Sequence, residues 1–329
     1  MTNRQDQRDQ QDPQDQQQRH HRHHFTITEN RRRTAVILSE KTTLPSQANG
    51  TDPVRTSPYQ DSVAAYWNAE RNPVNLRLGE VDGFYHHHYG IGEPDWSVLE
   101  GPQDTREERT VRELHRLESV QAQLLADHLG PIPADGRLLD AGCGRGGGSL
   151  VANRRFGCRV DGISISSHQV DFANQQAKEH GVDDKVRFHL RNMLDTGFET
   201  AAFDGIWNNE STMYVELGLL FAEHARQLKR GGRYVTITGC YNDTYGLPSR
   251  AVSEINAHYI CDIHPRSTYF KEMAANRLVP VSVIDLTAAT LPYWELRART
   301  HLTTGIEKSF IDAYKDGSFQ YLLIAADRI

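Results

Sequence analysis

The chain has 329 residues, a formal net charge of −6 and 38% hydrophobic residues, which suits one large domain or two small ones. The acidic balance, without a long basic stretch, disfavours nucleic acid as the main partner. No apolar run approaches the eighteen residues of a membrane span, no signal peptide is visible, and the unpaired spacing of the cysteines indicates reduced thiols in a cytoplasmic protein.

The N-terminal region is polar. Residues 1–24 are mostly Gln, Asp, Arg and His, and the first 57 residues hold almost no apolar run. Such a segment cannot bury enough apolar surface to offset the entropy cost of ordering it. We therefore expect residues 1–57 to be a disordered polar tail.

Two helices are predicted before the first strand. A short helix covers Tyr59–Ala69, and a loop rich in Gly, His and Tyr follows it. An amphipathic helix over 105–129 ends at Gly130-Pro131, and its apolar residues recur at helical spacing, namely Val111, Leu114, Leu117, Val120, Leu124 and Leu125. We assign residues 58–130 to an N-terminal helical cap.

Strands and helices alternate from residue 137 onward. Strands are predicted at 137–141, 158–163, 186–190, 203–208 and 233–239. The helix after the first strand ends near 155, and further helices are predicted near 166–180 and 215–229. This alternation is typical of an α/β fold with a parallel sheet covered on both faces.

The remaining chain completes the sheet. Residues 240–277 hold helices near 249–259 and 266–276, followed by a strand at 281–286, a helix at 305–315 and a last strand at 319–326. We predict a Rossmann-like, seven-stranded, mostly parallel sheet with an antiparallel edge strand. Residues 131–329 form this domain, and 240–277 is an insertion into it. Because ligands bind at the carboxyl ends of parallel strands, we expect the insertion and the N-terminal cap to cover the site.

The most informative motif is the glycine-rich stretch Leu138–Gly148 between the first strand and its helix. Asp140, Gly142, Gly144 and Gly146 form a D-x-G-x-G-x-G pattern, typical of the turn that holds S-adenosylmethionine in Rossmann-like methyltransferases. The same glycines can be read as the dinucleotide pattern G-x-G-x-x-G. A flexible loop without a ligand is the third reading.

Further residues fit the cofactor interpretation. We expect Asp140 near the ammonium group of the cofactor and Ser164, at the end of the second strand, near its ribose, with Gln169 adding a contact. Many nucleotide enzymes carry an acid where Ser164 stands, so a dehydrogenase is disfavoured. Asn192 and Met193 fit an adenine contact, although core packing also explains Met193.

A carboxylate stands at the end of the fourth strand. The segment Trp207–Tyr214 contains Asn208, which we expect to contact the cofactor, and Glu210. It lacks the Asn/Asp-Pro-Pro-Tyr motif of many amine methyltransferases. Methylation of a carbon instead needs stabilisation of a carbocation and removal of a proton, and Glu210 suits both tasks. A helix cap or a surface acid is the alternative role.

Aromatic residues are concentrated in or beside the cap segments. Because an aromatic face attracts a cation, such a lining fits a cationic intermediate. Ordinary packing accounts for most of the set, which comprises Phe84, Tyr85, Tyr89, Trp96, Tyr241, Tyr245, Tyr259, Tyr269 and Trp294.

Longer strings carry a family resemblance. Asn75–Gly92, Asp140–Gly148, Trp207–Tyr214, Arg233–Cys240 and Leu291–Arg297 together resemble the bacterial geranyl diphosphate 2-C-methyltransferases. That family makes the precursor of 2-methylisoborneol and is related to sterol and cyclopropane fatty-acid methyltransferases. The resemblance extends from about residue 58 to 329 and implies a class I S-adenosylmethionine methyltransferase fold.

The resemblance also implies roles for single residues. Glu210 would be the base, acting through water, and Tyr89 would hydrogen-bond in the same site. Tyr259 would take the cation–π position, where relatives can carry Phe. Asn75 would meet the diphosphate, with Arg77, His86, His87 and His88 as further diphosphate contacts, although we expect one or two of these histidines to be structural. Trp294 would also contact the substrate. The family requires Mg²⁺, held mainly by diphosphate oxygens and water rather than by protein ligands.

The implied reaction is methylation of geranyl diphosphate at C2, with positive charge at C3 and loss of a C2 proton. One alternative is the same fold acting on another lipid, such as a sterol, an acyl chain or a longer prenyl diphosphate. Another is a non-catalytic cofactor-binding subunit. A homo-oligomer is compatible with either reading.

Overall fold

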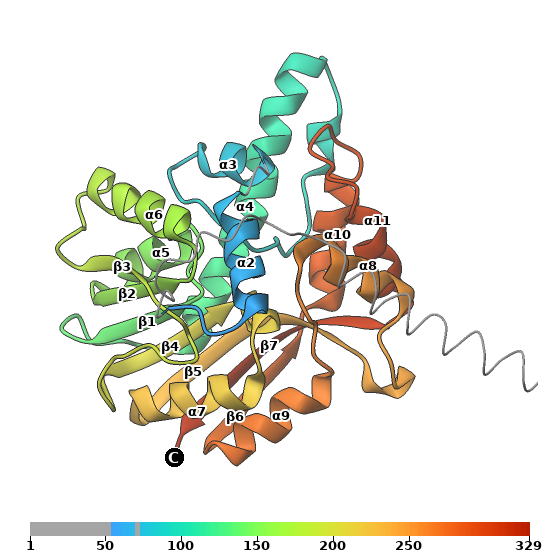
Figure 1. Cartoon of the computed structure of the whole chain (residues 1–329). Coiled ribbons are helices and arrows are strands. Elements are labelled where there is room, and N and C mark those ends of the chain that lie inside the picture. The colour runs from blue at the N-terminus through green and yellow to red at the C-terminus, as the bar shows by residue number, and fades with distance from the viewer. Residues whose placement is uncertain (1–53, 70–72) are drawn as a thin grey trace, which may run out of the picture. The chain divides into compact units, whose positions relative to one another are not determined.

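A computed structural model describes residues 54–69 and 73–329 (Figure 1). The predicted polar tail, apart from residues 54–57, lies outside the described residues. The described residues belong to one compact unit. Within the described residues, no helix has the length and apolar character needed to cross a membrane.

A seven-stranded sheet forms the centre of this unit, in the order β3-β2-β1-β4-β5-β7-β6. The first five strands in this order are parallel, and β7 runs antiparallel to both of its neighbours. The predicted mostly parallel sheet with antiparallel pairing at one edge is confirmed. The strands are β1 (Arg137–Ala141), β2 (Arg159–Ser164), β3 (Val186–Leu190), β4 (Phe203–Asn209), β5 (Leu228–Tyr241), β6 (Leu278–Asp285) and β7 (Phe319–Arg328).

The helices agree with the predicted pattern, with two additions. They are α2 (Pro58–Asn68), α3 (Pro73–Gly79), α4 (Gln103–Leu129), α5 (Gly147–Phe156), α6 (Ser167–Glu179), α7 (Leu217–Gln227), α8 (Arg250–Tyr259), α9 (Arg266–Ala275), α10 (Thr287–Arg297) and α11 (Glu307–Lys315), with 3₁₀ turns at Trp96–Leu99, Thr212–Tyr214 and Asp243–Tyr245. The sequence reading missed α3 and α10. The first is short, and the second contains Pro292, a residue that usually ends a helix.

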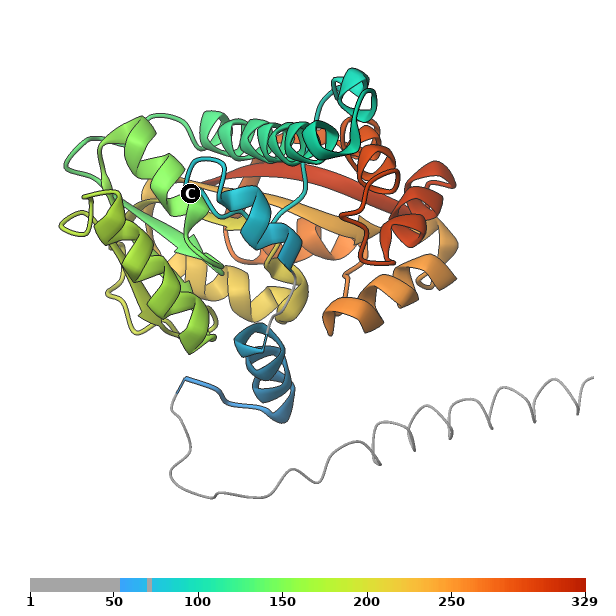
Figure 2. The ribbon, with the colours of Figure 1, turned by 90° about the horizontal axis from the view of Figure 1, so that it is seen from above.

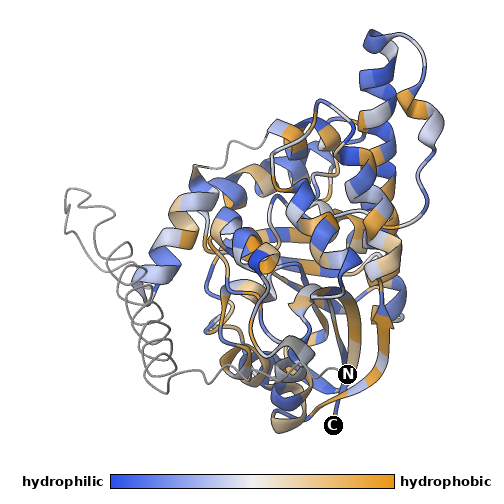
Figure 3. Ribbon diagram, turned by 90° about the vertical axis from the view of Figure 1, so that its right-hand side faces the viewer, coloured by the Kyte–Doolittle hydropathy of each residue, from blue (hydrophilic) through white to orange (hydrophobic). Residues whose placement is uncertain are grey.

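Helices cover both faces of the sheet (Figure 2), with α4 and α5 on one side and α7 and α9 on the other. Alternate strand residues face opposite layers: Leu138 packs in the α4 core, and its neighbour Leu139 packs in the core with α7. The strands are largely apolar, whereas the helices mix both kinds of residue (Figure 3). This is the pattern expected of a sheet buried on both faces.

The long helix α4 also carries polar residues into the interior. Glu118 and Gln121 are almost completely buried on its core-facing side. Buried polar side chains are costly unless they find partners, so these positions mark a region built for more than packing. Glu118 accepts a hydrogen bond from Tyr293 on α10, and Gln121 bonds to Asn209 at the carboxyl end of β4 and to Tyr321 near the amino end of β7.

Candidate active site

Two adjoining cavities lie at the carboxyl ends of the parallel strands. The first encloses about 690 Å³ and is bordered by the glycine-rich turn and by α2. The second encloses about 650 Å³ and is bordered mainly by aromatic side chains. Four residues border both cavities, namely Trp67, His87, Glu210 and Tyr214. The arrangement allows two ligands to meet at a shared wall.

The glycine-rich turn forms a close-fitting edge of the first cavity. Gly142 has a φ of +82°, and a Cβ there would lie 2.4 Å from the Cβ of Ser211. Its N–H and that of Cys143 donate to the carbonyl of Ile163 at 2.9 and 3.0 Å, which ties the turn to β2. Only glycine fits this backbone, and the bare turn lets a ligand approach the main chain.

Most of the predicted cofactor residues lie together around this cavity. Gly142, Gly144, Ser164, Gln169, Asn192 and Met193 all border it. The Ser164 hydroxyl donates to Gln169 Oε1 at 2.9 Å, so the two polar groups hold each other in place. Asn192 donates to Gln60 Oε1 at 3.0 Å, which joins the cavity wall to α2.

Three other predicted cofactor residues lie behind the cavity wall. Asp140 borders a neighbouring polar cavity of about 400 Å³ and accepts a hydrogen bond of 2.6 Å from Ser149, while burial raises its pKa to about 6. Asn208 is completely buried and donates to the Ala141 carbonyl at 2.7 Å. Gly146 begins α5 with a φ of +88°. Asn208 and Gly146 thus support the turn.

Glu210 stands at the junction of the two cavities, directly after β4. Its φ of +51° is unusual for a residue other than glycine, and its N–H donates to Ile237 at 2.9 Å. The half-buried side chain borders both cavities. The carboxylate therefore faces the place where a cofactor and a second ligand would meet.

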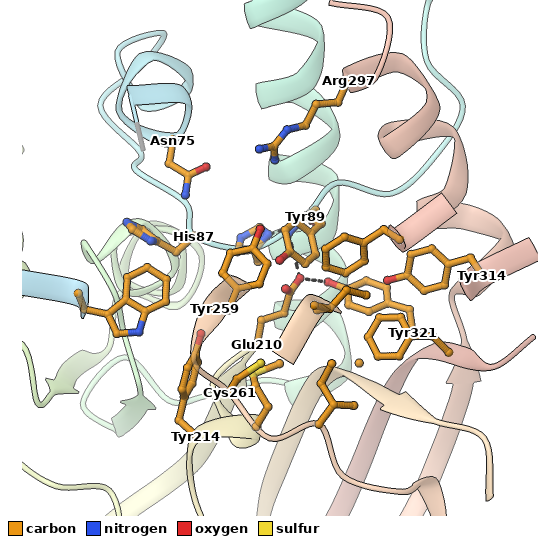
Figure 4. Close-up of a pocket in the computed structure, with 18 residues that line it drawn as sticks. Asn75, His87, Tyr89, Glu210, Tyr214, Tyr259, Cys261, Arg297, Tyr314 and Tyr321 are labelled. Atoms are coloured by element: carbon orange, nitrogen blue, oxygen red, sulfur yellow. Dashed lines mark hydrogen bonds between the residues drawn. The ribbon is translucent and has the colours of Figure 1, made fainter. Parts of the chain in front are cut away.

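One oxygen of this carboxylate has two donors. Glu210 Oε1 accepts from the backbone N–H of Tyr89 at 2.9 Å and from the hydroxyl of Tyr321 (Figure 4). Burial raises the pKa of Glu210 to about 8, and these two hydrogen bonds oppose that shift because they stabilise the charged form. A group titrating near neutral pH can exchange protons during a reaction.

Tyr89 and Tyr259 lie beside Glu210 in the second cavity, with their ring centroids 6.5 Å apart. Burial raises the pKa of Tyr259 to about 12, so its phenol remains neutral. The cavity is lined further by Trp67, Tyr214, Phe310, Tyr314 and Phe319. Such a wall presents several ring faces to a cation.

Asn75 and Arg297 form the polar end of this cavity, and His88 also borders the cavity. Arg297 is only 1% exposed, and its Nε lies 3.1 Å from Glu307 Oε1. Asn75 and Arg297 lie on one side of Glu210, and Cys261 lies on the other (Figure 4). A buried guanidinium opposite an apolar wall suits a ligand with an anionic head and a hydrocarbon tail.

Other predicted substrate residues do not border the second cavity. Arg77 is exposed and lies 3.7 Å from Glu107. Trp294 is fully buried and stacks on Phe310 with centroids 3.9 Å apart, so it supports the wall from behind. His86 borders the smaller polar cavity instead.

The sequence reading missed several residues that border the cavities. Arg297 is the last residue of Leu291–Arg297, one of the segments that carried the family resemblance. Because α10 was not predicted, the direction of the Arg297 side chain could not be inferred. Tyr321 lies in a predicted strand. The alternation of side chains along a strand shows which face a residue shares, but it does not identify the group that the Tyr321 hydroxyl contacts. Gln60 and Trp67 lie on the predicted first helix and carried no motif.

The described residues contain no group of three or more His, Cys, Asp and Glu side chains arranged to hold a metal ion. The polar end of the second cavity instead offers an amide and a guanidinium. These groups fit the oxygens of a diphosphate that brings its own Mg²⁺, because this ion typically keeps several waters and needs few protein ligands.

Comparison with known proteins identifies the family. A family described as methyltransferase domain matches residues 139–236. The geranyl diphosphate 2-C-methyltransferase of Saccharopolyspora erythraea is 70% identical over 281 residues, which are 85% of this chain and 98% of that protein. The Streptomyces coelicolor protein of the same name is 58% identical and covers 87% of this chain and 99% of its own length.

Solved structures agree. The geranyl diphosphate C-methyltransferase from Streptomyces coelicolor A3(2), in complex with Mg²⁺, geranyl-S-thiolodiphosphate and S-adenosyl-L-homocysteine, matches with a TM-score of 0.82 and 59% identity. The match covers 84% of this chain and all of that one. From its cavities, its fold and these relatives, the chain belongs to the geranyl diphosphate 2-C-methyltransferase family and has a class I S-adenosylmethionine methyltransferase fold.

Proposed function

We propose that the protein transfers the methyl group of S-adenosylmethionine to C2 of geranyl diphosphate and releases 2-methylgeranyl diphosphate. The observation that carries this proposal is the position of Glu210, which borders both the cavity beside the glycine-rich turn and the aromatic cavity. A carboxylate at that junction can act on a carbon that has just received a methyl group.

The first cavity would hold the cofactor, whose sulfonium supplies an electrophilic methyl group. The turn at Gly142 and Gly144 binds through its backbone, Ser164 and Gln169 offer neutral hydrogen-bonding groups to the ribose, and Met193 offers an apolar contact to the adenine. Trp67 would separate the cofactor from the second cavity, since it borders both.

The polar end of the second cavity would hold the diphosphate. Arg297 supplies a buried, permanently charged fork, and Asn75 and His88 add donors. Mg²⁺ would neutralise part of the diphosphate charge through the diphosphate oxygens and water. The diphosphate must remain attached, so this end of the cavity has to bind it without promoting its departure.

The reaction itself would take place in the middle of the second cavity. When the C2–methyl bond forms, the C2=C3 electron pair is used and C3 becomes positive. The rings of Tyr259 and Tyr89 and the charge of Glu210 stabilise C3. Glu210 then accepts the C2 proton, directly or through a water molecule, and the C2=C3 bond re-forms.

The segments 58–130 and 240–277 are proposed to enclose the site and exclude water. Within them, α2 borders the first cavity and α8 contributes Ile255 and Tyr259 to the second. Helices α10 and α11, outside both segments, complete the second cavity, whereas α9 packs against β6 and α7. A dry site strengthens each electrostatic contact in the reaction.

The test is incubation of the purified protein with labelled S-adenosylmethionine, Mg²⁺ and geranyl diphosphate, followed by mass spectrometry of the product. Parallel reactions with a sterol, an unsaturated acyl chain and farnesyl diphosphate compare the other lipid classes. Glu210→Gln should abolish turnover with little change in cofactor affinity. Tight cofactor binding without methylation of any prenyl diphosphate would instead support a non-catalytic role.

The protein is further proposed to work in the cytoplasm. Its four cysteines are free, as a reducing compartment would keep them. Cell fractionation tests this statement.

A further inference from the structure

We propose that Tyr321, oriented by Gln121, is a positioning residue that stabilises the ionised form of the Glu210 carboxylate and directs its other oxygen to the substrate. This inference rests on the proposed function, because it concerns how the base of that reaction is held. It follows from a hydrogen-bonded chain that joins α4, β4 and β7 beneath the second cavity.

This series of hydrogen bonds begins at the Glu210 carboxylate. Tyr321 on β7 is only 1% exposed and donates its hydroxyl hydrogen to Glu210 Oε1. Its oxygen accepts a hydrogen bond of 3.0 Å from Gln121 Nε2 on α4. A phenol that accepts one hydrogen bond becomes a stronger donor in the next, so Gln121 strengthens the contact with the carboxylate.

Gln121 is held rigidly in turn. It is completely buried, its Nε2 donates to Asn209 Oδ1 at 2.7 Å, and Asn209 Nδ2 donates back to Gln121 Oε1 at 2.9 Å. Asn209 immediately precedes Glu210 at the end of β4. The network therefore fixes the backbone that carries the base as well as the base itself.

This arrangement leaves the two carboxylate oxygens unequal. Oε1 has two donors, the Tyr321 hydroxyl and the Tyr89 N–H, whereas no described residue hydrogen-bonds to Oε2. The oxygen with fewer donors is the more available one for a proton. The left-handed backbone of Glu210, with a φ of +51°, persists because its surroundings determine it, as is common at functional sites.

The electrostatic surroundings explain why such a donor is needed. The charge of Glu210 raises the pKa of neighbouring acids from five elements or segments, namely Glu118 on α4, Tyr259 on α8, Tyr314 on α11, Tyr321 on β7 and Tyr89 in the loop after α3. The basic groups that border the same cavity are Arg297 on α10 and the imidazoles of His87 and His88. Burial raises the pKa of Glu210, and the Tyr321 hydroxyl is the side-chain group that lowers it. Removing this hydroxyl should therefore leave more of the base protonated at neutral pH.

The variant Tyr321→Phe tests the inference, because it keeps the ring and removes only the donor. We expect the acidic limb of the kcat/KM profile to move up by about one pH unit. At pH 7 kcat should fall about tenfold and should recover largely above pH 9, with KM for geranyl diphosphate nearly unchanged. Gln121→Met should shift the same limb by a smaller amount, since it weakens the donor without removing it.

Tyr269→Phe is the matched control. Tyr269 is also fully buried, and its hydroxyl bonds to Thr212 at 2.8 Å and Thr238 at 3.0 Å without contacting Glu210. Its loss should change thermal stability but not the pH profile. If Tyr321→Phe lowered activity equally at all pH values, or left activity unchanged, the positioning role would be overturned.

A second readout does not depend on turnover. The infrared band of a protonated buried carboxyl, identified as the band absent from Glu210→Gln, reports the titration of Glu210 directly. The band should persist to higher pH in Tyr321→Phe than in the wild type. An absence of product in the wild type would count against the proposed function, whereas an unshifted band would count against the role of Tyr321.

Discussion

The ring of Phe319 occupies the space that a side chain on Gly239 would need. A Cβ built on Gly239 would lie 2.2 Å from Phe319 Cζ, and both residues border the second cavity. Phe319 also stacks on Tyr314, with centroids 5.2 Å apart and an interplanar angle of 26°. Part of the cavity wall is therefore a tightly packed aromatic layer. The position of this layer depends on Gly239 having no side chain.

Gly239→Ala should push the Phe319 ring out of its place. Because the layer is buried and closely packed, we expect a loss of roughly 1–3 kcal/mol in the free energy of unfolding and a lower kcat/KM for geranyl diphosphate. Denaturant unfolding and steady-state kinetics measure these two effects. The double variant Gly239→Ala/Phe319→Leu should regain most of the loss, and failure to do so would argue against this contact as the cause.

Phe319→Leu should relax selectivity for the length of the prenyl chain. The smaller side chain enlarges the apolar part of the second cavity, which we expect to hold the hydrocarbon tail. We expect the ratio of kcat/KM for farnesyl to geranyl diphosphate to rise about tenfold, as hydrophobic pockets discriminate by one to two orders of magnitude. Direct competition between the two substrates measures the ratio. An unchanged ratio would show that another part of the cavity limits chain length.

Arg297→Lys should weaken binding of the diphosphate. Lysine keeps the positive charge but loses the planar fork, so KM for geranyl diphosphate should rise about tenfold while kcat changes little. Arg77→Lys is the comparison, because Arg77 is exposed and borders neither cavity. A larger effect of Arg77→Lys than of Arg297→Lys would assign the diphosphate to a different part of the protein.

Tyr259 should act through its ring rather than its hydroxyl. Tyr259→Phe keeps the ring face and should be mild, whereas Tyr259→Ala should lower kcat by about tenfold or more, in line with a cation–π contribution of roughly 1–2 kcal/mol. Single-turnover rates with saturating cofactor report this step most directly. Equal activity of the two variants would remove the cation–π role.

The ionisation of Glu210 should also affect stability. Burial raises its pKa from 4.5 to about 8, so the folded protein binds this proton more tightly than the unfolded chain does. The free energy of unfolding therefore falls as pH rises from about 4.5 to about 8. Glu210→Gln cannot ionise, so the variant should gain on the order of a few kcal/mol over the wild type at pH 9 relative to pH 5. Urea unfolding at both pH values tests this, and an equal difference at the two would show that Glu210 titrates normally.

Sequence by itself determined the α/β framework, the glycine-rich turn and Glu210. The strands from Arg137 to Tyr241 are apolar runs separated by amphipathic helices, a period that local composition reveals. The turn at Gly142 needs glycine for a backbone reason, and an acid directly after β4 must stand at the carboxyl edge of the sheet. These properties depend on residues close together in the sequence, so they can be predicted from the sequence alone.

Only the tertiary structure decided which distant side chains complete the site. Tyr321 reaches Glu210 because β7 is inserted between β5 and β6, in a register that places Tyr321 opposite Gly239. Arg297 reaches the second cavity from α10, a helix that the sequence did not predict because it contains Pro292. Local periodicity sets which residues share a face, whereas the order and register of strands and the packing of helices bring residues far apart in sequence to one carboxylate.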